Sequence, residues 1–406
     1  RMICTKIPEV LAPAGDFERL KAAVTYGADA VYLAGKQFGM RASQTNFDEE
    51  SLVRAVEYCH AHGVRVYLTV NVLPRNEEID ALPPYLCQAA EAGVDAMIVS
   101  DLGTLSLVKR VIPQMEIHIS TQTGIVNYET ANVLYEMGAK RVVLARELSL
   151  REIAEIRRRT PPELEIEAFV HGAMCMSFSG RCVISNYLTG RDANRGECAQ
   201  PCRWGYHLME EKRPGLYFPV FEDEKGSYIL NAKDLCMIEY IDALAEAGIT
   251  SFKIEGRAKS SYYVSVVTNA YRIAVDDYLR DPAHFSLRPW LLEEVTKVSH
   301  RQYSTGFYFG TPEQYYQNGG YIREYDIVAL VSGYEDGRLL LTQKNKFCAG
   351  DTVEVLEPGK EPVSFVVSDM KNAEGEPIDA ACHPEMTLSV SFDRPLAAAS
   401  VVRKAK

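Results

Sequence analysis

The sequence has no apolar run that approaches the roughly 18 residues of a membrane-spanning helix, so we expect no contact with a membrane interior. Its first residues, Arg1-Met2-Ile3-Cys4, contain no hydrophobic signal core. It also lacks an excess of positive charge, because 44 Lys and Arg against 55 Asp and Glu give a net charge of −11. A protein with this charge does not bind polyanions through its overall field. Any contact with nucleic acid therefore needs a local basic surface.

Several familiar motifs are missing as well. The sequence contains neither His-Glu-x-x-His nor Gly-x-Ser-x-Gly, which disfavours the common zinc proteases and serine hydrolases. No Gly-x-Gly-x-x-Gly follows the first predicted strand, so nothing supports a dinucleotide-binding site there. His171 lies four residues before Cys175, but a single pair of this kind is a weak indication of a thiol nucleophile.

What remains is the composition of an ordinary globular chain, with 47% hydrophobic, 24% charged and 10% aromatic residues. A length of 406 residues corresponds to about two or three domains. The ten cysteines, without a signal sequence, favour a reducing compartment, and we expect a cytoplasmic protein.

A repeated pattern runs through the first two-thirds of the chain. Helical segments end in a glycine, and a short run rich in β-branched residues follows at once, as at Gly27, Gly63 and Gly138. A glycine that ends a helix and leads into a buried parallel strand is typical of βα units. The pattern predicts eight strands, at about residues 8–12, 30–35, 65–71, 96–100, 116–121, 141–146, 165–170 and 251–256.

Eight strands separated by helices predict a TIM-like (β/α)8 barrel over residues 1–285. The long interval after the seventh strand predicts a cysteine-rich insertion at about residues 172–235. A doubly wound sheet is the alternative α/β fold. We expect residues 286–325 to form a helical, aromatic connector, and the alternating apolar pattern of residues 326–406 predicts a small C-terminal β-barrel domain.

In a (β/α)8 barrel the active site lies at the carboxyl ends of the strands. Polar and charged residues end otherwise apolar strands of this chain, and burying them is costly unless they are paired. One or two of them can instead be structural ion pairs. The residues are Asn71, Asp101, Gln122, Arg146, Glu147, His171, Lys253, Glu255 and Arg257.

Four of the ten cysteines, Cys175, Cys182, Cys198 and Cys202, follow the seventh strand closely. Four thiolates at one barrel mouth form an all-sulfur site that suits an iron–sulfur cluster or zinc. The first spacing, six residues between ligands, is longer than in most zinc sites and favours iron–sulfur. Structural zinc and ordinary core cysteines are the alternatives. Cys236 is a rival fourth ligand, which we interpret instead as a buried helical residue.

Basic residues gather around these cysteines, although the chain as a whole is acidic. A cationic rim beside such a site suggests an anionic substrate, such as a phosphate backbone or a carboxylate. Unrelated, solvated surface charges are the alternative. The residues are Arg181, Arg191, Arg195, Arg203, Lys233, Lys253, Arg257 and Lys259.

Several segments resemble peptidase family U32, the collagenase-like proteins. The run Glu167–Cys175, followed after four residues by Gly180–Ser185, is similar to the long family signature. The resemblance covers about residues 8–285, and the tail resembles the C-terminal β domain of the family. Further similar segments are Leu11–Asp16, Gly196–Trp204 and Lys253–Arg257.

The resemblance implies two kinds of activity. Some family members are described as peptidases, whereas others are oxygen-independent hydroxylases that carry iron–sulfur clusters. The Cys-x3-Cys-Arg-Trp ending, Cys198–Trp204, is most similar to the tRNA uridine 5-hydroxylation branch (TrhP type), for which prephenate is the implied hydroxyl source. We therefore expect a tRNA-modifying enzyme that 5-hydroxylates the wobble uridine with a 4Fe-4S cluster and a prephenate-like donor. A U32-type peptidase and a non-catalytic RNA-binding scaffold are the alternatives, and a second U32-family subunit is a further potential partner.

This interpretation gives each candidate residue a role. The expected cluster ligands are Cys175, Cys182, Cys198 and Cys202. The expected substrate contacts are Asn71, Gln122, Arg146, Lys253 and Arg257. The candidates for proton transfer are Glu147, His171 and Glu255.

Overall fold

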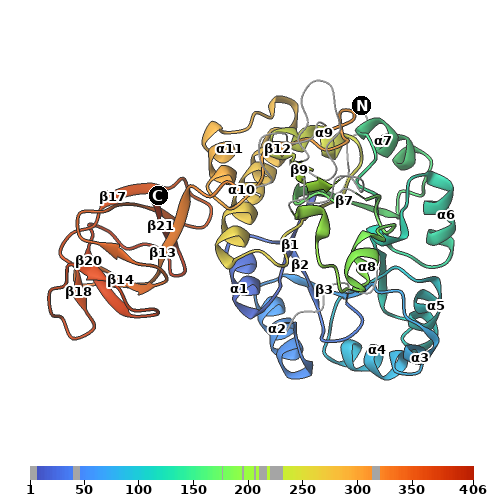
Figure 1. The fold of residues 1–406 in the computed structure, drawn as a ribbon, viewed down its shortest axis with the longest axis horizontal. Coiled ribbons are helices and arrows are strands. Elements are labelled where there is room, and N and C mark those ends of the chain that lie inside the picture. The colour runs from blue at the N-terminus through green and yellow to red at the C-terminus, as the bar shows by residue number, and fades with distance from the viewer. Residues whose placement is uncertain are drawn as a thin grey trace.

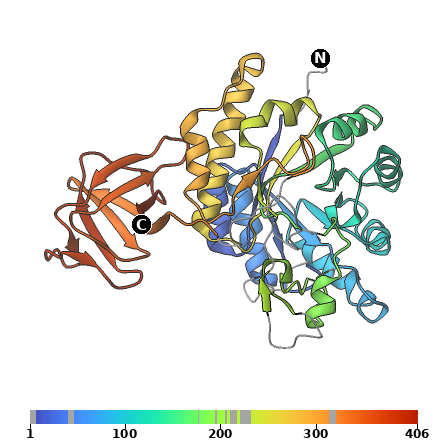
Figure 2. The same ribbon diagram turned by 45° about the horizontal axis from the view of Figure 1, so that its top comes forward.

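The chain folds into a parallel barrel ringed by helices, with a smaller antiparallel domain at one side (Figure 1). The C-terminal domain, in orange and red, stands beside the barrel in both ribbon views (Figure 2). The computed structural model describes residues 7–39, 46–175, 177–193, 196–204, 207–209, 217–219, 232–312 and 321–406.

Eight parallel strands close the barrel. β1 pairs with β2 on one side and with β11 on the other, and β11 also pairs with β7. Phe252 of β11 lies opposite Val10 of β1 and Ala168 of β7, so the ring has no open edge there. This closure confirms the predicted (β/α)8 barrel and excludes the doubly wound sheet. The strands are β1 (Glu9–Pro13), β2 (Ala30–Ala34), β3 (Arg65–Val70), β4 (Ala96–Val99), β5 (Glu116–Ile119), β6 (Arg141–Val143), β7 (Glu165–Gly172) and β11 (Ser251–Ile254).

Helices cover the outside of the barrel and bury their apolar faces against it (Figure 1). In α2, for example, Leu52, Val56 and Cys59 are buried, as their helical spacing predicts, and the Asp48 carboxylate caps the first turn. No helix in the described part of the chain combines the length and apolarity needed to cross a membrane. The helices are α1 (Phe17–Thr25), α2 (Glu49–Ala61), α3 (Asn76–Ile79), α4 (Leu82–Glu91), α5 (Leu102–Val111), α6 (Tyr128–Glu136), α7 (Leu150–Arg158), α9 (Ile241–Glu246), α10 (Ser261–Arg280) and α11 (Pro289–Thr296).

The insertion between β7 and β11 returns to the barrel through one added strand. β10 (Asp234–Cys236) runs antiparallel to the end of β7, with Cys236 opposite His171, and β12 (Tyr303–Ser304) pairs with β10. The expectation of a helical Cys236 is therefore wrong, because the returning backbone takes its hydrogen-bond partners from β7. Other elements of the insertion are α8 (Ile184–Thr189), the 3₁₀ turn η3 (Pro201–Arg203), β8 (His207–Met209) and β9 (Tyr217–Pro219).

The C-terminal domain is a seven-stranded antiparallel sheet with its own apolar core. It joins the barrel through buried Arg403, whose guanidinium donates to Glu294 of α11 at 2.8 Å and to Glu354 at 2.9 Å. The Tyr26 hydroxyl of the barrel donates to the Leu356 carbonyl at 2.9 Å. The sheet strands are β13 (Tyr325–Glu335), β14 (Arg338–Gln343), β16 (Thr352–Leu356), β17 (Val363–Val366), β18 (Lys371–Asn372), β20 (Thr387–Ser391) and β21 (Val401–Ala405); β15 (Phe347–Cys348) pairs with β19 (Ala380–Ala381).

Candidate functional site

A cavity of about 180 Å³ opens at the carboxyl ends of the barrel strands. The insertion after β7 forms one wall, and the strand ends form the floor and the other walls. The structure thus brings together residues that lie as far apart in the sequence as Asn71 and Arg257. The predicted residues that line the cavity are Asn71, Gln122, Arg146, Cys175, Cys182, Cys198, Cys202, Lys253, Glu255 and Arg257.

Two of the cavity sulfurs receive N–H donors. Arg146 Nη2 lies 3.5 Å from the Cys175 sulfur, and the Gln200 backbone N–H lies 3.4 Å from the Cys198 sulfur. The Arg146 guanidinium is itself fixed, since it donates to the Ala173 carbonyl at 2.9 Å. Hydrogen bonds and a positive charge beside cysteine favour the thiolate and metal-bound forms of sulfur.

The donor set suits an iron–sulfur cluster in its chemistry: four cysteines line one cavity, and N–H groups lie close to the sulfurs of two of them. The thiols are half-buried except that of Cys175, which is exposed. In the described residues, no group of three or more His, Cys, Asp or Glu side chains meets the geometry for a single metal ion. Cys236, the rival ligand, does not line the cavity, and burial raises the pKa of its thiol to about 12.

Glu147 does not line this cavity; it holds the loop that carries the cysteines. Its carboxylate accepts hydrogen bonds from the Ser179 backbone N–H and the Ser179 hydroxyl, each at 3.0 Å. Ser179 lies between Cys175 and Cys182 in the chain. Gly180, at φ +75°, then lies on the Gln122 backbone so closely that an added Cβ would be 1.9 Å from the Gln122 carbonyl oxygen. A glycine is required there for the loop to reach the barrel.

His171 also lies outside the cavity. Its ring is buried, and its two nitrogens are 3.3 Å from the Tyr271 hydroxyl and 3.2 Å from the Tyr303 hydroxyl. Burial lowers the pKa of His171 to about 3, and the electrostatic effects of His300 and Lys259 act in the same direction. The imidazole is consequently neutral at pH 7 and is part of an aromatic core.

Asp101 has a local structural task. Its carboxylate accepts a hydrogen bond from the Thr104 backbone N–H at 2.8 Å and so caps the first turn of α5. A capping interaction of this kind stabilises a helix by about 1 kcal/mol. Asp101 therefore follows the end of β4 because it caps the helix that begins there, α5.

The charged side chains of the cavity floor are almost completely buried. The Lys253 ammonium pairs with Glu167 at 2.7 Å and lies 4.5 Å from the centre of the Tyr32 ring. The Arg257 guanidinium donates to the Thr69 hydroxyl at 3.3 Å. The backbone of Glu255 is fixed, because its N–H donates to the His171 carbonyl at 2.8 Å.

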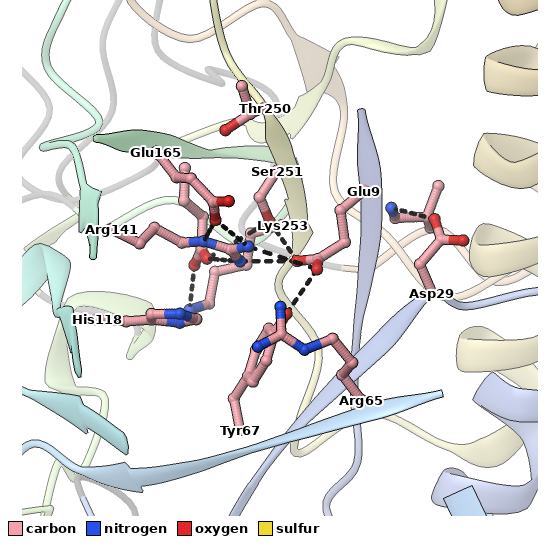
Figure 3. Close-up of polar contacts among 12 residues, drawn as sticks. Glu9, Asp29, Arg65, Tyr67, His118, Arg141, Glu165, Thr250, Ser251 and Lys253 are labelled. Carbon is pink, nitrogen blue, oxygen red and sulfur yellow. Dashed lines mark hydrogen bonds and ion pairs between the residues drawn. The ribbon is translucent and has the colours of Figure 1, made fainter. Parts of the chain in front are cut away.

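Beneath the floor, charged residues fill the barrel interior (Figure 3). The buried Arg141 guanidinium pairs with Glu9 at 2.7 Å, with Glu165 at 2.7 Å and with Glu167 at 3.0 Å. Burial alone raises the pKa of Glu167, but the nearby Lys253 and Arg141 charges outweigh it and lower the pKa to about 2. We did not predict this network from the sequence. Its only signal was single charged residues inside otherwise apolar strands.

The fold and site define a (β/α)8 barrel protein with a four-cysteine mouth. The chain belongs to peptidase family U32: the family profile matches residues 15–318, and the profile of the peptidase family U32 C-terminal domain matches residues 323–403. This membership confirms the resemblance that the Glu167–Cys175 and Gly180–Ser185 segments indicated.

Similar proteins carry different names. The chain is 39% identical to tRNA hydroxylation protein P1 of Bacillus subtilis (strain 168), an alignment that covers 100% of this chain and 97% of that protein. It is 38% identical to the 23S rRNA 5-hydroxycytidine synthase of Escherichia coli (strain K12), over 67% of this chain and 40% of that protein. It is 36% identical to a collagenase of Porphyromonas gingivalis, over 74% of this chain and 73% of that protein.

Proposed function

We propose that this protein is a tRNA-modifying enzyme that 5-hydroxylates the wobble uridine without oxygen. In this proposal a 4Fe-4S cluster is held by the four cavity cysteines, and a prephenate-like molecule is the hydroxyl donor. The observation that carries the proposal is that these cysteines line the same cavity as Glu255 and Arg257. The names of two relatives support hydroxylation of RNA: one, similar over the whole chain, is named for tRNA hydroxylation and the other for 5-hydroxycytidine in rRNA.

The cavity residues suit one extruded base. A nucleobase must leave its stack to reach a cavity inside a barrel mouth. The amides of Asn71 and Gln122 can donate to and accept from the edge of a uracil ring. Arg257 can hold a phosphate or a carboxylate, which a guanidinium binds through two parallel hydrogen bonds. A bound cluster would supply electron transfer next to this base.

Glu255 is our candidate for proton transfer. It lines the cavity, whereas Glu147 binds Ser179 and His171 is enclosed by tyrosines. A positioned carboxyl group that gives or takes a proton typically accelerates a reaction by about 10²- to 10⁴-fold. Arg146 keeps a positive charge beside Cys175, which stabilises negative charge on that side of the site.

The collagenase relative makes a peptidase the second candidate. Cysteine-dependent hydrolysis needs a thiolate and an imidazole within hydrogen-bond reach of each other. The described residues that line the cavity include no histidine, and both nitrogens of His171 face tyrosine hydroxyls. The described residues of the cavity therefore do not support cysteine-dependent hydrolysis.

Anaerobic purification followed by iron and sulfide analysis tests the proposal. We expect about four irons and four sulfides per chain in the wild type, and loss of both in Cys182→Ala. Cys348→Ala, which removes a half-buried thiol of the C-terminal domain, is the matched control and keeps the cluster. Metal-free wild-type protein, or one tightly bound zinc, contradicts the cluster.

The second part of the test is mass spectrometry of tRNA from cells that lack the gene. Complementation with the wild type or Cys348→Ala restores 5-hydroxyuridine derivatives, whereas Cys182→Ala does not. Unchanged tRNA in the deletion strain contradicts the proposed substrate even if the cluster is present, and then favours the scaffold or the peptidase.

A further inference from the structure

An apolar face is exposed on the cysteine insertion, beside the cavity mouth. The exposed fractions of Val183, Tyr187, Leu188 and Trp204 are 67%, 88%, 47% and 48%. Large apolar side chains gathered in this way are uncommon on a protein surface and mark binding sites. Figure 2 shows the green segment that contains α8 projecting from the end of the barrel.

This face begins at the cavity wall. Ile184, the first residue of α8, lines the cavity, and Tyr187 and Leu188 follow it by three and four residues. Residues at these intervals lie on the same side of a helix. Ser185 lies on the other side, buried, where its hydroxyl accepts a hydrogen bond from the Ala199 N–H at 3.0 Å.

Trp204 reaches the same rim from the second half of the insertion. Cys202, two residues earlier, lines the cavity, and η3 contacts α8. The Trp204 N–H donates to the Pro201 carbonyl at 3.1 Å, which fixes the backbone at this point. Two exposed aromatic residues, Tyr187 and Trp204, therefore lie within three residues of ones that line the cavity, Ile184 and Cys202.

The segment that carries this face is basic within an acidic protein. Residues 175–204 contain four arginines and two acidic residues, a net charge of +2, against −11 for the whole chain. Arg181 and Arg191 are exposed, as is the acidic Glu197. Aromatic rings interspersed with arginines are the surface that single-stranded nucleic acids use, because bases stack on the rings and phosphates pair with the cations.

We propose that Tyr187 and Trp204 are stacking platforms for the unpaired bases that flank the nucleotide in the cavity. The face on α8 would hold a single-stranded RNA loop while one base enters among the cysteines. This inference rests on the proposed function, and it adds the structural state of the substrate and the residues that select it. Phe178 of the same insertion is likewise exposed, and it lines the cavity.

Fluorescence anisotropy with the anaerobically purified full chain tests the inference. The probe is a fluorescein-labelled anticodon stem-loop RNA with uridine at the wobble position. Tyr187→Ala and Trp204→Ala should each weaken binding by about 5- to 150-fold, the contribution of one stacked base. Tyr187→Phe keeps the ring and should bind within about twofold of the wild type. Val133→Ala, which truncates an exposed residue of α6, is the control.

The salt dependence of binding separates stacking from charge. Arg181→Ala should reduce the slope of log affinity against log salt by about one, whereas Tyr187→Ala should leave the slope unchanged. Iron content is measured for each variant, so that loss of the cluster is not mistaken for loss of stacking.

Four results overturn the inference. Wild-type affinity in both alanine variants rejects stacking but leaves the proposed function intact. Equal losses in Tyr187→Phe and Tyr187→Ala assign binding to the hydroxyl and not to the ring. If sedimentation shows a dimer that Tyr187→Ala dissociates while RNA affinity is unchanged, the face binds a second copy of the chain. A wild type that does not bind the RNA rejects the proposed function as well.

Discussion

The two ends of the barrel interior use the same eight strands for different purposes. At the amino end, Arg141 pairs with three carboxylates and no ligand is needed to compensate its charge. At the carboxyl end, four cysteines, two arginines, a lysine and a glutamate line a cavity. The comparison indicates that the filled end maintains the shape of the barrel, while the hollow end arranges its polar groups around a cavity.

Lys253 belongs to both ends. Its ammonium lines the cavity floor but pairs with Glu167 of the buried network. An anion that binds at Lys253 must therefore share the ammonium with Glu167.

The largest effect is expected at the hollow end. Glu255→Gln should lower the rate of tRNA hydroxylation by about 10²- to 10⁴-fold, because the proton-transfer group is lost while the shape is kept. Single-turnover assays with the cluster-loaded enzyme measure this hydroxylation rate. Glu197→Gln, which changes an exposed carboxylate of the same insertion, should have the wild-type rate. A fully active Glu255→Gln enzyme would show that Glu255 does not transfer the proton.

At the filled end the expected effect is on stability. Arg141→Met leaves Glu9, Glu165 and Glu167 without their shared cation, and should lower the free energy of unfolding by about 3–5 kcal/mol. Urea unfolding measures this change. Arg158→Met, which removes an exposed ion pair with Glu155, should cost less than about 1 kcal/mol. Similar costs for the two variants would mean that the buried network does not maintain the barrel.

Acid should weaken the filled end through Glu167. Its pKa in the folded protein is about 2, below the ordinary value of 4.5, so its contribution to stability is complete above about pH 5 and is lost as the pH falls from 4.5 towards 2. The unfolding free energies of the wild type and Glu167→Gln should therefore converge by on the order of 3 kcal/mol between pH 6 and pH 2.5. A difference that stays constant across this range would show that Glu167 does not titrate with folding.

A smaller effect is expected where Glu147 supports the cysteine loop. Glu147→Ala removes both acceptors of Ser179 and should speed iron loss to a chelator by about 10-fold, as for other residues that support metal ligands. Glu152→Ala, which removes the acidic residue of the α7 capping box, is the control and should lose iron at the wild-type rate. Equal rates of iron loss in Glu147→Ala and Glu152→Ala would show that the contact between Glu147 and Ser179 does not stabilise the cluster.

The smallest effect is expected at His171. Because its pKa is about 3, it does not titrate near pH 7, so His171→Gln should leave the pH profile of hydroxylation between about pH 6 and 8 unchanged. The rate should stay within about threefold of the wild type. If one limb of the pH profile disappears in His171→Gln, His171 takes part in proton transfer after all.

The sequence was sufficient to predict the eight strands and the meeting of four cysteines with residues such as Glu255 and Arg257. Strand periodicity and the rule that barrel sites lie at the carboxyl ends determine both. The sequence pattern does not predict in which direction neighbouring side chains point. Arg146 and Glu147 lie in a turn beyond the last residue of β6, where strand alternation does not predict side-chain direction, and Arg146 lines the cavity whereas Glu147 does not.

The remaining errors come from contacts between distant segments. Cys236 forms a strand because β7 offers it partners, and His171 is enclosed by tyrosines that lie 100 and 132 residues further along the chain. The network around Arg141 depends on closure of the ring, which brings Glu9 next to β6. Local propensity contains no information about such pairings.

The order of synthesis gives the closure of the ring a further consequence. β1 and β7 both pair with β11, which is synthesised only after residues 173–250 have been made. At the usual speed of a ribosome this interval lasts about 4 to 16 s. During it two strand edges are open, and unpaired edges are where nascent chains associate wrongly. The insertion that carries the cysteines therefore also lengthens the time during which the edges of β1 and β7 stay unpaired.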